Sequence, residues 1–124
     1  PVNRFVASFI GETNFIAATA GEGAARLGTG DLVQVAGLKT GGSVTVTIRP
    51  EQLSLVAPNA AGALAATVTS LVYFGTDTHC YMTLSDGTEV MARLQTSATG
   101  DADLSRGQKL ALRFAPGAVQ ILED

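Results

Sequence analysis

The most constraining feature of this chain is a correspondence between two stretches of sequence that lie 66 residues apart. Residues 41–50 and residues 107–116 both begin at a glycine turn, continue with alternating apolar residues and end at a proline. The matched positions are Val44, Val46, Ile48, Pro50, Leu53 and Leu55 with Leu110, Leu112, Phe114, Pro116, Val119 and Ile121. Alternation with a period of two indicates a strand with one buried face, and proline ends such a strand because it cannot donate to the ladder. The correspondence therefore predicts two related β units.

Short runs of alternating or β-branched residues extend this pattern over the whole chain. They lie at residues 14–20, 24–27, 32–36, 44–49, 53–55, 64–74, 79–84, 89–95, 109–115 and 118–122. In the longest run the alternation shifts near Ser70 and Leu71, which predicts a bulge or a bend at that point. Asp86 and Gly87 form one of the strongest turn pairs, and they predict a tight hairpin between two of these strands.

The composition favours a single all-β domain over residues 1–124. The 14 glycines are spread at turn-like spacing, which is typical of short strands joined by tight connections. Hydrophobic residues make up 46% and charged residues 15% of the chain, so we expect a packed core rather than disorder. A linker of small residues at 57–62 separates a first β unit at 13–56 from a second, unequal unit at 63–124.

One short helix is expected over residues 3–11, within a junction formed by residues 1–12. Asn3 is suited to cap its first turn, and Gly11 is suited to the left-handed position that ends a helix. The apolar residues between them recur at helical spacing. Because two turns are too short to be stable alone in water, we expect this apolar face to pack on another part of the protein.

The distribution of charge argues against nucleic acid as a partner. The eight basic residues are scattered along a chain of net charge −3, whereas nucleic-acid-binding proteins concentrate them on one face and often add stacking aromatic residues. The sequence has no signal-peptide pattern, and no apolar run approaches the ~20 residues that a membrane helix needs. Because the chain begins at Pro1 without methionine, we expect it to be part of a longer protein.

No pattern in the sequence indicates a catalytic or metal site, so we expect a domain that is not an enzyme. The glycine turns lack the lysine and the following helix of a phosphate-binding loop. The single cysteine, Cys80, excludes an intrachain disulfide and follows His79 within a predicted strand. Neighbouring strand residues point to opposite faces, so these two side chains cannot bind one metal ion. We interpret Cys80 as a buried structural thiol and His79 as a surface or cross-strand residue.

Arg49, Pro50 and Glu51 form a candidate interaction site. Pro50 fixes the direction of the chain where a predicted strand ends. The two charged side chains beside it can pair with each other, orient the corner or meet a partner surface. A structural corner and a binding role both stay open for this segment.

Four segments of the chain resemble a known family in their order and their residues. They are residues 3–14 (Asn-Arg-Phe-Val-Ala-Ser-Phe-Ile-Gly-Glu-Thr-Asn), residues 48–51 (Ile-Arg-Pro-Glu), residues 73–75 (Tyr-Phe-Gly) and residues 107–116. This pattern resembles the TOBE (transport-associated OB) domain, the C-terminal regulatory region of bacterial ABC-import ATPases. The segment Phe-Ile-Gly-Glu-Thr-Asn is similar to the spermidine/putrescine importer branch, and iron-importer relatives stay open as an alternative.

The resemblance implies an OB-like β-barrel that has no catalytic role of its own. It implies that ATP and Mg²⁺ are bound by an ATPase domain before Pro1, in a subunit that hydrolyses ATP to import polyamines or a related small solute. The expected location is the cytoplasmic face of the bacterial inner membrane. We expect the domain to form a homodimer, and to contact its own ATPase domain and, through it, the membrane permease subunits.

An alternative role implied by the resemblance is the sensing of a small oxyanion. Related OB-type domains bind such anions with backbone amides and a few Ser, Thr or Lys side chains. Ser43, Thr45 and Lys109 are the candidate ligands in this chain, although their spacing is not distinctive.

Overall fold

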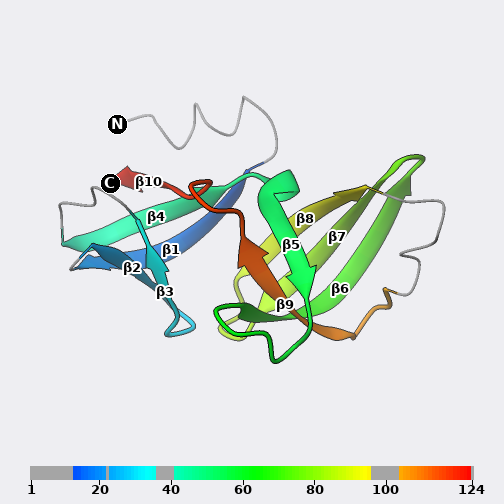
Figure 1. The fold of residues 1–124 in the computed structure, drawn as a ribbon, viewed down its shortest axis with the longest axis horizontal. Coiled ribbons are helices and arrows are strands. Elements are labelled where there is room, and N and C mark those ends of the chain that lie inside the picture. Colours follow the sequence, from blue (N-terminus) through cyan, green and yellow to red (C-terminus); the bar gives the residue numbers. More distant parts are fainter. Residues whose placement is uncertain (1–12, 22, 36–40, 96–103, 124) are drawn as a thin grey trace. The chain divides into compact units, whose positions relative to one another are not determined.

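The computed structural model describes residues 13–21, 23–35, 41–95 and 104–123, which form two antiparallel sheets of five strands each (Figure 1). Within these ranges the helical structure is limited to one 3-10 turn, η1 (Pro50–Gln52). The prediction of an all-β fold is confirmed. The helix predicted over residues 3–11 lies outside the described residues.

The first compact unit takes its residues from Pro1–Arg49 and Ala115–Asp124. The order of its sheet is β10-β4-β1-β2-β3. The strands are β1 (Asn14–Gly21), β2 (Ala24–Leu27), β3 (Leu32–Gln34), β4 (Gly42–Ile48) and β10 (Gln120–Glu123). Ile16, Ala25, Val46 and Ile48 are almost completely buried and form much of its core. The apolar residues that alternate along β4 in the sequence are therefore core residues, as predicted. The expected exposed face is absent from Val44 to Ile48, because Thr45 and Thr47 are buried as well.

The second compact unit is formed by Pro50–Phe114, and its sheet has the order β5-β9-β6-β7-β8. The strands are β5 (Leu53–Val56), β6 (Leu64–Phe74), β7 (Asp77–Leu84), β8 (Glu89–Gln95) and β9 (Lys109–Phe114). β8 contacts both η1 and β5, so the sheet curves into a half-barrel. Val68, Met82 and Leu112 are among the largest side chains in its core.

The two sheets have the same strand order when β6 to β9 are matched with β1 to β4 and β10 is matched with β5. The register also agrees with the offset found in the sequence. Leu55 of β5 is opposite Leu112 of β9, and the matched residue Ile121 of β10 is opposite Val46 of β4. The predicted relation between the two halves of the chain is thus present in their topology.

The division of the chain into units differs from the predicted one. Each closing strand joins the sheet of the other half: β5 pairs with β9, and β10 pairs with β4. The boundaries consequently fall after Arg49 and after Phe114, while residues 57–63 form turns between β5 and β6 within one unit. Pro50 and Pro116 lie near the two points where the chain passes from one sheet to the other. Because proline cannot continue a ladder of hydrogen bonds, the short strand that follows each proline is free to pair in the other sheet.

The predicted irregularity in β6 is confirmed as a bulge between Val68 and Ser70. Main-chain hydrogen bonds link it to the turn before β9: Gly107 N–H donates to Val68 O at 2.7 Å, and Val68 N–H donates to Gln108 O at 2.9 Å. Arg106 Nε also donates to Thr69 O at 3.3 Å. A bulge exchanges the two faces of the strand beyond it. Beyond the bulge, each side chain of residues 70–74 therefore points to the face of the sheet opposite to the one that regular alternation would give it.

The hairpin predicted at Asp86 and Gly87 is also confirmed. Gly87 has a φ of 93°, in the left-handed region that favours glycine. The Thr88 N–H donates to Asp86 Oδ1 at 3.0 Å, and this hydrogen bond lowers the pKa of the Asp86 carboxyl. The turn fixes the pairing of β7 with β8, which carry several of the candidate residues described next.

Candidate functional site

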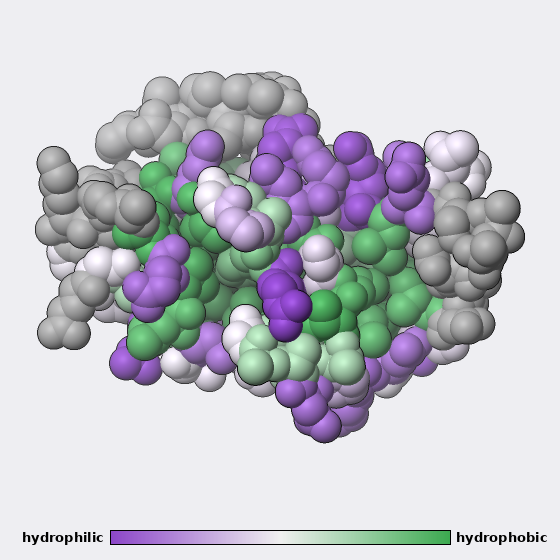
Figure 2. Space-filling view, viewed as in Figure 1, coloured by the Kyte–Doolittle hydropathy of each residue, from purple (hydrophilic) through white to green (hydrophobic). Residues whose placement is uncertain are grey.

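The predicted corner lies where the chain passes from β4 into η1. Pro50 is the first residue of η1 and is buried, whereas Arg49 and Glu51 on either side of it are exposed. Glu51 Oε1 lies 3.8 Å from Arg93 Nη2 on β8, and Arg93 Nε lies 3.9 Å from Asp77 Oδ2 on β7. Arg93 therefore links η1 to the β7–β8 hairpin. Figure 2 shows hydrophilic residues gathered over η1 and the adjacent end of β8.

These ion pairs orient the corner more than they stabilise it. The side chains of Arg93, Glu51 and Asp77 are 40%, 36% and 40% exposed. Exposed pairs of this kind contribute about 0.2–1 kcal/mol each, because water and salt screen them. Burial of Pro50 and of the following Leu53 is the more substantial contribution to the position of η1. Pro50 is therefore a buried residue of this corner, and the charged side chains beside it are accessible to a partner.

The three candidate oxyanion ligands are divided between the two units. Ser43 and Thr45 lie on β4 of the first unit, and Lys109 begins β9 of the second. Ser43 and Lys109 are exposed, but Thr45 is only 4% exposed. Neither unit by itself therefore contains the complete set of predicted ligands.

Cys80 and His79 point to opposite sides of β7, as predicted, because burial alternates along this strand. Cys80 is completely buried, and its burial raises the pKa of the thiol to about 11. The thiol is therefore neutral at physiological pH, which agrees with the structural role inferred from the sequence. The His79 ring lies 4.5 Å from the Phe74 ring, measured between centroids.

The described residues contain no group of three or more His, Cys, Asp or Glu side chains that could hold a metal ion. No helix in the same ranges has the length and apolar character that crossing a membrane requires.

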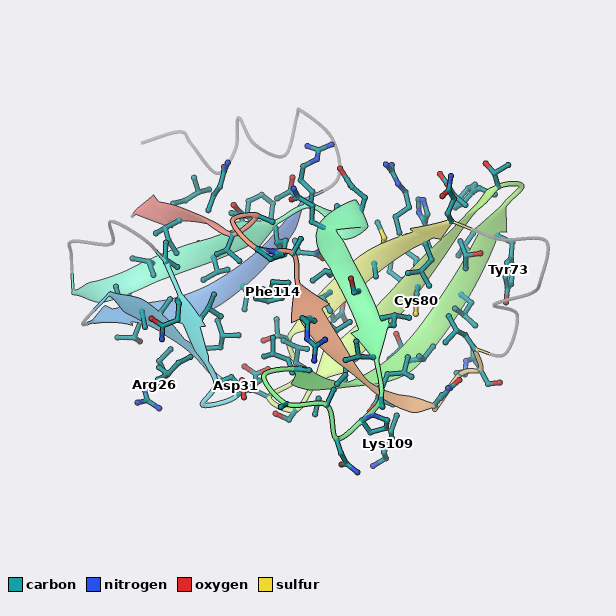
Figure 3. The ribbon with its side chains drawn as sticks, viewed as in Figure 1. Arg26, Asp31, Tyr73, Cys80, Lys109 and Phe114 are labelled. Carbon is teal, nitrogen blue, oxygen red and sulfur yellow. The ribbon has the colours of Figure 1, made fainter. Side chains whose placement is uncertain are left out.

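The sequence reasoning missed a run of exposed apolar residues at the end of β6. Val72, Tyr73 and Phe74 are 38%, 58% and 55% exposed, and Tyr81 on the neighbouring strand β7 is 38% exposed. We call these four residues the tip patch. Figure 3 shows the Tyr73 side chain extending away from the β6 ribbon. The available signal was the shift in alternation before these residues, which places apolar side chains on both sides of the strand.

A family model described as the TOBE domain matches residues 46–122, which include η1, the whole second unit and all but the last residue of β10. The chain belongs to the TOBE domain family. The resemblance found in the sequence is thereby confirmed. The matched region of this TOBE domain contains both points at which the chain passes from one sheet to the other, with all of β5 and the first three residues of β10.

The curated relatives of this TOBE domain include spermidine/putrescine import ATP-binding proteins PotA. The protein from Ruegeria pomeroyi is 38% identical over 130 residues, covering 100% of this chain and 35% of the relative. PotA 1 from Pseudomonas aeruginosa is 42% identical over 132 residues, covering 100% of this chain and 35% of the relative. The Mesorhizobium japonicum protein is 37% identical over 132 residues, covering 100% of this chain and 36% of the relative. The chain thus spans about a third of these relatives and matches their C-terminal region.

Among solved structures, the TOBE domain is similar to the molybdate-bound crystal structure of the cytoplasmic molybdate-binding protein ModG. The TM-score is 0.71, and the match covers 90% of this chain and 96% of that chain at 18% sequence identity. At this level of identity the likeness shows a shared fold alone.

Proposed function

We propose that this TOBE domain is the non-catalytic regulatory and dimerisation domain of an ABC transporter ATP-binding subunit. The observation that carries the proposal is the match of the whole chain to about a third of each PotA relative. In the longer subunit, a preceding ATPase domain hydrolyses ATP to drive import of polyamines or a related small solute. The subunit works at the cytoplasmic face of the bacterial inner membrane, where the ATPase domain contacts the permease subunits.

ATP and Mg²⁺ belong to the ATPase domain and not to this chain. The glycine turns within the described residues precede strands and not helices, and none has the lysine of a phosphate-binding loop. These features support the proposal that this chain supplies contacts while the ATPase domain supplies the chemistry.

The architecture supports a role as a coupling domain. The second unit is a half-barrel in which η1 contacts β8, and this arrangement favours an OB-like barrel with its outer surface available for contact. A domain that forms a two-fold pair holds two ATPase subunits together while they separate and close during transport. Arg49 and Glu51, exposed on either side of the buried Pro50, are candidate contact residues in that role.

The experiment compares the full-length subunit with a variant that ends before this domain, each reconstituted with the permease in vesicles. We expect both proteins to hydrolyse ATP, and the shortened subunit to lose most of its spermidine- or putrescine-dependent transport. Separately added domain, with no ATPase portion, should hydrolyse none. Transport that is unchanged by the deletion would contradict a regulatory role for the domain.

Oxyanion sensing is the second candidate function, and the fold likeness to a molybdate-binding protein favours it. It requires Ser43, Thr45 and Lys109, or the main chain near them, to approach one anion. The burial of Thr45 weighs against this arrangement. Calorimetry with molybdate, sulfate, phosphate and spermidine distinguishes the two roles: saturable heat with an oxyanion supports sensing, and its absence with all four leaves the regulatory role ahead.

A further inference from the structure

The β6–β7 hairpin is longer than its counterpart in the first unit. Ile16 of β1 faces Val46, and Leu64 of β6 faces Leu112, which is the residue matched with Val46. On this alignment β1 ends at the position of the β6 bulge, and β6 continues for five more residues as 70–74. β7 has eight residues where β2 has four. The second unit therefore carries an extension that the first unit does not need for the same topology.

The extension carries the tip patch. Val72, Tyr73 and Phe74 are consecutive and exposed, although a strand with one buried face would expose only every second side chain. Among the described residues of the first unit, only Leu32 is a large apolar side chain with comparable exposure, at 55%. A run of exposed apolar residues lowers solubility unless it forms a contact. The difference between the units indicates that the extension has a partner.

The size of the patch decides which kind of partner fits. Stable interfaces between free proteins use roughly 20–30 residues on each side, far more than the four side chains of this patch. A partner on the same polypeptide is present at an effective concentration of about millimolar, so a small apolar patch is sufficient to hold it. Nearly two-thirds of each PotA relative lies outside the region matched by this chain, which provides such a tethered partner.

We propose that the tip patch docks on an apolar surface of the remainder of the same subunit, the ATPase portion that precedes this chain. This inference rests on the proposed function, which supplies that portion. Docking buries Val72 and Phe74, which share one face of β6, and it orients the half-barrel relative to the ATPase portion. The contact is reversible because it is small, and it can therefore open and close as the subunit works.

The test is photo-cross-linking in the full-length subunit with Phe74 replaced by benzoylphenylalanine. Light and heavy isotope-labelled subunits are mixed before irradiation, so that mass spectrometry separates cross-links within one polypeptide from those between two. The matched control places the same label at Leu32, whose exposure equals that of Phe74. We expect cross-links from position 74 to the ATPase portion in light–light and heavy–heavy pairs only, and none to that portion from position 32.

Light–heavy cross-links from position 74 would show a second copy as the partner and overturn the inference. A yield at position 74 no higher than that of the control would overturn it as well. ATP hydrolysis measured on the same samples keeps the two proposals apart. If the subunit hydrolyses ATP but forms no cross-link, only the docking inference is contradicted. If the unlabelled subunit does not hydrolyse ATP, the proposed function is contradicted. A second variant, Tyr73→Thr with Phe74→Thr, should increase hydrogen exchange in the facing segment of the ATPase portion, and unchanged exchange there contradicts docking.

Discussion

The β1–β2 hairpin of the first unit and the β6–β7 hairpin of the second share a register but differ in length and in what they expose. β1 ends where the β6 bulge begins, and only β6 continues into a segment with apolar side chains on both sides. The shared part of the two hairpins carries core residues such as Ile16 and Leu64. The comparison separates what the fold requires from what the proposed docking uses. Shared positions hold the sheets together, and the extension offers a surface.

The largest expected effect comes from removing β10 by ending the chain after residue 116. This change takes away the strand that pairs with β4, while β5 still pairs with β9 in the second sheet. We expect the amides of β1 to β4 to exchange quickly with solvent, and those of β6 to β8 to keep most of their protection. Hydrogen exchange followed by mass spectrometry measures both. Unchanged protection of β4 would show that the exchanged strand is dispensable.

A truncated core residue should have the next largest effect. Leu112 is 1% exposed, and Leu112→Ala should lower the free energy of unfolding by about 2–5 kcal/mol, because it removes buried methyl groups and leaves a cavity. The matched variant Val46→Ala, at 0% exposure, should cost less because fewer atoms are removed. Urea denaturation measures both. Equal losses for a half-buried control, Leu110→Ala, would contradict the assignment of the core.

The alternating apolar residues made part of this core predictable from the sequence. Val44, Val46 and Ile48 show in the sequence which residues of β4 enter the apolar core, and the β6 bulge is visible as a shift in alternation. The burial of Thr45 and Thr47 on the other face of β4 is not visible in this pattern. Alternation gives the face of a strand but not its neighbour. The alternation of Leu53 and Leu55 does not indicate which sheet they join, so the exchange of β5 and β10 could not be derived.

The candidate sites were predictable to a smaller extent. Pro50 marked the corner because its ring ends a ladder, but the contact of Glu51 with Arg93 joins residues far apart in the sequence. Exposure of Tyr73 and Phe74 depends on where the barrel stops, and apolar residues in a strand normally indicate a core. The structure reveals their exposure, because this end of β6 pairs with β7 but extends beyond its pairing with β9.

A pH-dependent effect should distinguish Cys80 from the exposed side chains of the tip patch. Burial raises the pKa of Cys80 from 9.0 to about 11, so the unfolded chain releases its proton at a lower pH than the folded chain. The stability is complete below pH 9 and falls as the pH rises toward about 11, by about 2–3 kcal/mol in total. Urea denaturation between these pH values, with Cys80→Ala as the reference, measures the loss. The same pH dependence in both proteins would contradict the buried thiol.

The smallest effect is expected at the corner of the second unit. Arg93→Ala removes both exposed ion pairs and should lower the free energy of unfolding by about 0.2–1 kcal/mol, with less effect at high salt. Arg26→Ala in the first unit, at an exposed arginine that donates to Gly30 O, is the matched control. Thermal unfolding at two salt concentrations compares them. A loss of several kcal/mol for Arg93→Ala would give the corner a larger structural role than its exposure indicates.

The central proposal is that this chain contributes contacts between subunits rather than chemistry, and the self-association of the chain tests that proposal most directly. Sedimentation velocity of the 124-residue chain over a wide range of concentrations should show a monomer converting to a dimer. The same conversion should persist in the variant with Tyr73→Thr and Phe74→Thr, because the tip patch is assigned to the ATPase portion. A chain that stays strictly monomeric at the highest concentration would contradict dimerisation through this domain.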